Sequence, residues 1–168
     1  MRRLATAVAL ALVALVVWAS PSGAAKPAPA PDFEVTFPAG VACADFDLTI
    51  QGTGGNRVYR EFVDEDGNVV RSISAGTGSA LTYINVTTGA SMATRSNGAV
   101  MKTYYNPDGS YTQVATGHNV IILFPTDDPP GPSTTLYVGR VAYTIGTDGV
   151  FTLQSANGKS TDICAALS

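Results

Sequence analysis

The sequence has one histidine, His118, and two cysteines, Cys43 and Cys164. A Ser-His-Asp arrangement needs a histidine as its general base, and His118 lies in "TGHN", a predicted turn where a polar residue is expected in any case. The chain also has no Gly-x-Ser-x-Gly segment. Zinc sites need several histidine or cysteine ligands. We therefore expect no catalytic residue, no metal site and no cofactor.

Basic residues and long apolar runs are also scarce. The chain has 10 Lys and Arg against 13 Asp and Glu, whereas proteins that bind nucleic acid present a basic face. The one long apolar run covers residues 4–18 and stops before Ser20 and Pro21, which is shorter than the roughly 20 residues of a membrane-spanning helix. Nucleic acid and membranes are therefore not expected partners of the mature protein.

The N-terminus has the pattern of a secretory signal peptide. Arg2 and Arg3 precede the apolar run, and small residues at 22–25 suit a cleavage site. Removal of residues 1–25 leaves 8 basic and 13 acidic residues, a net charge of −5. An uncleaved N-terminal anchor is the less favoured alternative. We predict a secreted protein with a Pro/Ala-rich spacer over 26–32 and a single β domain over 33–168.

The two cysteines both fall in the exported part of the chain. An even cysteine count outside the cytosol is typical of a disulfide. With one histidine, the chain lacks further ligands for a thiolate metal site. We predict a disulfide between Cys43 and Cys164, which would join the region after the first strand to the C-terminus.

The remaining sequence predicts an all-β fold. Turn residues recur about every ten positions, often as Asn-Gly or Asp-Gly, which tolerate the positive φ of tight hairpins. Val, Ile, Thr, Tyr and Phe fill the runs between them, without a helical period. We expect an antiparallel meander of about ten strands closed into a barrel, with a two-sheet β-sandwich as the alternative.

Three segments predict how their strands are buried. In "DFDLTIQG" (45–52), Phe46, Leu48 and Ile50 alternate with polar residues, so one face should be wet. "NVIILF" (119–124) is apolar on both faces and should run through the middle of the structure. "TTLYVGRVAYTI" (134–145) is long enough to bend, with Gly139 as a bulge or a point of close approach.

The segment "FPTDDPPGPSTT" (124–135) interrupts the pattern of tight turns. Its four prolines withhold backbone donors, so residues 125–133 cannot continue a β ladder. Long loops in compact domains are often functional, and Asp127 and Asp128 would then offer free carboxylates to a cation or a basic partner. Equally, the prolines would only stiffen a crossover between two strands.

Tyrosines supply the aromatic surface, since the single tryptophan lies in the leader. Tyr104 and Tyr105 are adjacent on one predicted strand and must point to opposite faces. Tyr111, across the "NPDG" turn, would pair with one of them. These tyrosines and His118 are candidate ligand or partner contacts, although cross-strand packing alone accounts for the tyrosines.

Several segments together resemble a group of small exported proteins from high-GC actinobacteria. They are the leader, the cysteine spacing, "ATGHNVIILFPTDDPPGP", "LYVGRVAYTI" and "GKSTDICAALS". The resemblance implies export and a shared β domain, and it carries no activity or catalytic residue.

The favoured function is therefore a secreted, non-enzymatic binding domain. Its target would be a small ligand in the barrel mouth, or an extracellular or cell-wall partner at the 125–133 loop. The first alternative is a secreted hydrolase that uses carboxylates, with or without His118. The second is a structural component of the cell envelope or matrix.

Overall fold

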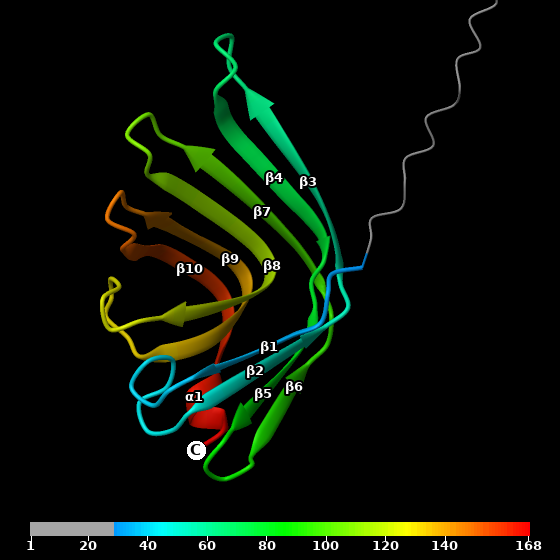
Figure 1. Ribbon diagram of the computed structural model, residues 1–168, viewed down its shortest axis with the longest axis vertical. Helices are drawn as coiled ribbons and strands as arrows, with labels where there is room; N and C mark the ends of the chain where they lie inside the picture. The colour runs from blue at the N-terminus through cyan, green and yellow to red at the C-terminus, as the bar shows by residue number, and fades with distance from the viewer. Residues whose placement is uncertain (1–28) are drawn as a thin grey trace, which may run out of the picture.

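The computed structural model describes residues 29–168 and shows ten strands and one short helix (Figure 1). The predicted signal peptide and the start of the predicted spacer lie outside the described residues. The elements are β1 (Phe33–Phe37), β2 (Leu48–Thr53), β3 (Asn56–Val63), β4 (Val69–Thr77), β5 (Ala80–Asn85), β6 (Ser91–Thr94), β7 (Gly98–Tyr105), β8 (Tyr111–Leu123), β9 (Ser133–Ile145), β10 (Phe151–Asp162) and α1 (Ile163–Ala166). In residues 29–168, no helix has the length and apolar character that a membrane span requires.

The strands form two antiparallel sheets, so the predicted closed barrel is wrong and the predicted sandwich fits. The four-stranded sheet has the order β1-β2-β5-β6, and the six-stranded sheet has the order β10-β9-β8-β7-β4-β3. The first strand pairs with β2 and the last with β9. The barrel does not close because β1 and β10 end in different sheets and the chain turns into α1 after β10.

The two sheets are nevertheless two parts of one meander. Leu48 pairs with Asn85 in the four-stranded sheet, and Asn56 pairs with Thr77 in the six-stranded sheet. The pairing of β2 with β5 and the pairing of β3 with β4 share one register, so no residue is inserted or skipped between the two sheets. The same holds for β4 and β5 against β7 and β6. The long strands therefore bend from one sheet into the other at corners such as Gly54 and Gly55.

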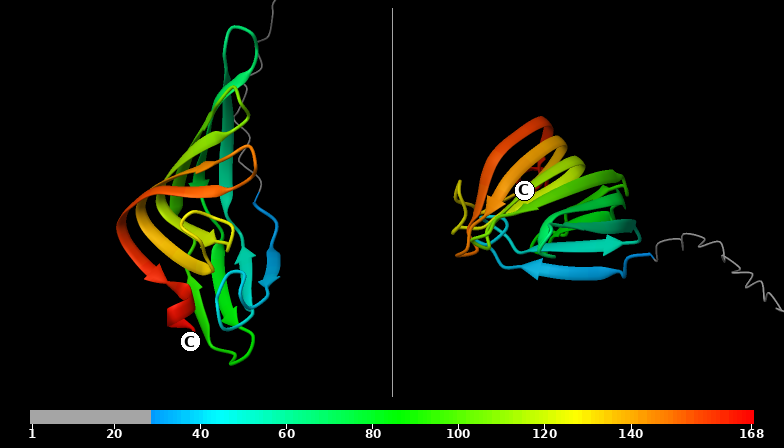
Figure 2. Two further views of the ribbon diagram at one scale, coloured as in Figure 1. Left: turned by 90° about the vertical axis from the view of Figure 1, so that its left-hand side faces the viewer. Right: turned by 90° about the horizontal axis from the view of Figure 1, so that it is seen from above.

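A row of glycines crosses the six-stranded sheet and lets β8, β9 and β10 bend. The cross-strand register aligns Gly76, Ala99, Gly117, Gly139 and Gly158. All four glycines have positive φ, and a Cβ atom on any of them would strike the backbone of a neighbouring strand. The last three strands curve as an arch (Figures 1 and 2). This confirms the close approach predicted at Gly139.

Apolar side chains form two separate clusters. The first lies around Phe46, Leu48, Ile50 and Tyr83, and includes Ile163 of α1. The second lies inside the arch, where Ile121 and Leu123 on one leg meet side chains on the other; its buried members are Ile121, Leu123, Val141 and Tyr143.

The predicted strand burial holds with two corrections. Phe46, Leu48 and Ile50 are all buried, as predicted, but the strand begins only at Leu48, and Thr49 on the expected wet face is buried as well. Thr49 exchanges a hydrogen bond of 2.7 Å with Thr36, because β1 covers this strand. Side chains of the segment 119–124 pack in both apolar clusters, as predicted for a strand that runs through the middle of the structure.

The predicted disulfide between Cys43 and Cys164 is present, with Cα atoms 5.6 Å apart. Cys43 lies in the loop between β1 and β2, and Cys164 lies in α1. Asp162 caps the N-terminus of the helix, because its carboxylate accepts a hydrogen bond from the Ala165 N–H. The disulfide thus ties the four-stranded sheet to the end of the six-stranded one.

Candidate functional site

Polar and aromatic side chains gather on one face of the six-stranded sheet, which we call the inner face. We define this face by Tyr59, Ser72, Thr103, Gln113 and Tyr143, which alternation along the strands and the cross-strand register bring together. It continues into the inside of the arch, because Tyr143 also belongs to the second apolar cluster.

The first hydrogen-bonded group on this face centres on Tyr105. Its hydroxyl lies 3.4 Å from the Tyr59 hydroxyl and 3.2 Å from the Ser72 hydroxyl. Tyr59 in turn donates a hydrogen bond of 3.0 Å to Glu61. Tyr59, Glu61 and Tyr105 are exposed, so ligand atoms can reach this group from solvent.

The second group centres on Gln113. Its Nε2 donates a hydrogen bond of 3.0 Å to the Thr103 hydroxyl, and its Oε1 accepts one from the Tyr143 hydroxyl. The Tyr143 ring stacks on Phe151 with ring centroids 4.4 Å apart. Burial, with the nearby Tyr111 hydroxyl, raises the pKa of Tyr143, against an opposing effect of Arg57. Tyr143 is therefore a neutral hydroxyl at physiological pH.

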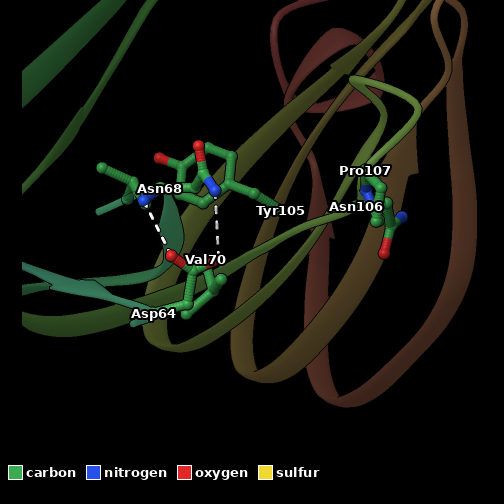
Figure 3. Close-up of a pocket in the computed structure, with 7 residues that line it drawn as sticks. Asp64, Asn68, Val70, Tyr105, Asn106 and Pro107 are labelled. Carbon is green, nitrogen blue, oxygen red and sulfur yellow. Dashed lines mark hydrogen bonds between the residues drawn. The ribbon is translucent and has the colours of Figure 1, made fainter. Parts of the chain in front are cut away.

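A pocket of about 370 Å³ lies beyond Tyr105, at the hairpin tips (Figure 3). The β3–β4 turn contributes Asp64 and Asn68, and the β7–β8 turn contributes Asn106 and Pro107. Asp64 accepts hydrogen bonds from the N–H groups of Asp66 (3.0 Å) and Asn68 (2.8 Å). Backbone hydrogen bonding from Asn68 lowers the pKa of Asp64. The Asp64 carboxylate therefore shapes the turn.

A second cavity, of about 270 Å³, lies where the strands bend from one sheet to the other. Arg57, Met101 and Tyr143 line it, as do Asn119 and His118. The Nδ2 group of Asn119 is buried and has no hydrogen-bond partner among the described residues. An unmet buried donor is costly, so Asn119 is an unsatisfied polar group beside this cavity.

The structure separates the three tyrosines that the sequence singled out. Tyr105 and Tyr111 are register partners on the inner face, with ring centroids 6.1 Å apart. Tyr104 is paired with Arg71 and Thr112 and points to the opposite face. The predicted pairing of Tyr111 with one of the two tyrosines is thus with Tyr105, and Tyr104 does not join the site.

The loop after β8 binds its own backbone rather than leaving both carboxylates free. Asp127 accepts hydrogen bonds from the N–H groups of Phe124 (2.7 Å) and Phe151 (3.4 Å), and it is buried. The backbone of Asp128 exchanges hydrogen bonds with Phe151 and Leu153 of β10. The expectation of a free Asp127 carboxylate is therefore wrong, because this carboxylate fastens the loop to β10. The side chain of Asp128 is exposed.

Other candidate chemistry finds little support in the described residues. Residues 29–168 hold no group of three or more His, Cys, Asp or Glu that could ligate a metal. The Asp47 carboxylate accepts a hydrogen bond from the Ala39 N–H at 2.8 Å. His118 is exposed at the rim of the corner cavity.

The polar residues of the inner face are the ones that the sequence analysis missed. Ser72, Thr103 and Gln113 each lie on a different strand, Arg57 lies near the start of β3, and Asn119 lies within β8. The available signal was weak: Ser72 and Ser74 alternate with larger side chains on β4, but on β7 Thr103 follows the apolar Met101 at the same face. Only the cross-strand register shows that these residues meet.

Comparisons of the chain with protein-family models, with curated proteins and with solved structures gave no match.

Proposed function

We propose that this protein is a secreted binding domain that holds a neutral polar ligand, such as a saccharide chain, along the inner face. One observation carries the proposal: two hydrogen-bonded groups, around Tyr105 and around Gln113, lie on one face between two cavities. The signal-peptide pattern and the disulfide between Cys43 and Cys164 favour an extracellular location.

The chemistry of the face favours a sugar over a charged or wholly apolar ligand. Hydroxyl and amide groups both donate and accept hydrogen bonds, which matches a ligand rich in hydroxyls. The tyrosine rings add apolar surface with a polar tip, which suits ligands that are wet on one side. Asn119 lines the corner cavity at the other end of the face and adds an amide to its polar groups.

The other functions considered from the sequence are less favoured. A carrier with an apolar lumen needs a closed barrel, and these strands form two open sheets. A hydrolase needs two carboxyl groups across a cleft, whereas Glu61 is bonded to Tyr59 and Asp64 to its own turn. A partner that binds the 125–133 loop would contact the exposed carboxylate of Asp128, because the Asp127 carboxylate is hydrogen-bonded within the loop.

Adjacent tyrosines on opposite faces provide a matched test. Binding of cello-, chito- and malto-oligosaccharides should be measured by calorimetry on the wild type, on Tyr105→Ala and on Tyr104→Ala. For the oligosaccharide that binds, Tyr105→Ala should weaken affinity roughly tenfold, the loss expected for one aromatic contact and one hydrogen bond. Tyr104→Ala should bind as the wild type does. Equal effects of the two variants, or no binding in any series, would refute the proposal.

A further inference from the structure

Within residues 29–168, β3 is an edge strand with an unusual composition, since no described strand pairs with its outer side. It is the last strand of the six-stranded sheet, and three of its apolar or aromatic side chains face solvent, with exposed fractions of 55% for Val58, 58% for Tyr59 and 59% for Val63. Proteins usually protect such edges with lysine, proline or short strands. The opposite edge, β10, carries polar residues such as Asn157 and Lys159 instead.

The charges on β3 limit the ways in which two copies of it can pair. A two-fold antiparallel pair places one residue opposite itself in the partner. Centring the pair on Arg57 or on Arg60 sets like charges face to face, and centring it on Glu61 does the same. Centring it on Tyr59 instead places Arg57 opposite the partner's Glu61, and this contact occurs twice.

We propose that the protein forms a two-fold dimer through antiparallel pairing of β3 with the partner's β3, centred on Tyr59. Three contacts define the register: Tyr59 against the partner's Tyr59, Val58 against the partner's Arg60, and Arg57 against the partner's Glu61. The edge backbone groups gain hydrogen bonds and the exposed apolar side chains gain neighbours. The six strands of each copy then continue into those of the other.

The dimer does not depend on what the inner face binds. A two-fold axis perpendicular to the sheet keeps the inner faces of the two copies on the same side. Two binding faces would then lie next to each other on one surface, an arrangement that raises the avidity for a long or repeated ligand.

Cysteine crosslinking tests the register directly. Residues opposite each other in antiparallel strands have Cα atoms about 4.5–5.5 Å apart, within the range that a disulfide can span. Tyr59→Cys should form a covalent dimer on mild oxidation, with the native disulfide intact. Arg60→Cys alone should not, whereas a mixture of Val58→Cys and Arg60→Cys should form the mixed dimer. Non-reducing mass spectrometry distinguishes these products.

Charge reversal tests the same register without new cysteines. By sedimentation velocity over a concentration series, Arg57→Glu should raise the dimer dissociation constant roughly tenfold or more, since two attractive pairs become repulsive. Adding Glu61→Arg to this variant should restore the wild-type value. The proposal is overturned by a wild-type protein that stays monomeric at all concentrations, by equal crosslinking at positions 58, 59 and 60, or by a double variant no better than the single one.

Discussion

Replacing Gly117 with alanine tests why glycines form a row across the six-stranded sheet. Gly117 has a φ of +96°, and a Cβ atom there would collide with the carbonyl oxygen of Gly98 and lie 3.1 Å from the Cα of Ala99. The substitution therefore combines two separable costs. One is the left-handed backbone conformation, and the other is the contact with the neighbouring strand.

Two other glycines separate these costs. Gly109 has a similar φ of +92° with open space around it, and Gly98 has open space without a left-handed φ. Gly98→Ala should change the free energy of unfolding by about 0.5 kcal/mol or less. Gly109→Ala should cost about 1–2 kcal/mol for the backbone conformation. Gly117→Ala should cost about 1–3 kcal/mol more than Gly109→Ala, because backbone atoms must move apart.

Urea unfolding of the oxidised protein measures all three variants. The midpoint should fall in the order Gly98→Ala, Gly109→Ala, Gly117→Ala, with the slope of the transition unchanged. A Gly117→Ala protein no less stable than Gly109→Ala would refute the reasoning. The arch would then tolerate a side chain in the row, and close approach would not be the reason for glycine.

Three further predictions concern stability. Replacing both Cys43 and Cys164 with serine should lower the free energy of unfolding by up to about 5 kcal/mol, given a sequence separation of 121 residues, as measured by urea unfolding against the wild type. Asp127→Ala should cost about 1–3 kcal/mol because it strips two partly buried backbone N–H groups of their acceptor; Asp128→Ala should cost under about 0.5 kcal/mol, and equal losses would contradict the scaffold role. Burial raises the pKa of Tyr83 to about 12. Stability that Tyr83 contributes below pH 10 should therefore fall as the pH rises from 10 towards 12; Tyr83→Phe should flatten this fall in thermal melts, and an unchanged pH profile would count against it.

Local patterns predicted the strands well because they depend on neighbours in the sequence. Turn residues set the hairpins, and alternation placed Phe46, Leu48 and Ile50 in one core. The bend at Gly139 followed from a glycine inside a long strand. Whether the sheet closes into a barrel could not be predicted in the same way, since closure depends on where the first and last strands lie in space.

The candidate site was harder to predict for a related reason. Tyr105 and Tyr111 face each other across a short hairpin, which the sequence shows directly. Gln113 and Tyr143 meet only through the register of β8 with β9, and no spacing in the sequence marks them. Asp127 was misread because a carboxylate in a stiff loop looks the same whether it caps backbone N–H groups or stands free.

The unbroken register between the two sheets also bears on how the chain folds. The pairing of β2 with β5 continues the pairing of β3 with β4 in the same register. This whole region is therefore a single long hairpin whose turn lies at Asp66 and Gly67. Pairing can start at that turn and extend outward without closing a large loop at any step. Each later strand then adds beside the strand just before it, so the contact order stays lower than that of two sheets that must form apart and then dock. The disulfide adds a contact between two positions that are 121 residues apart along the chain.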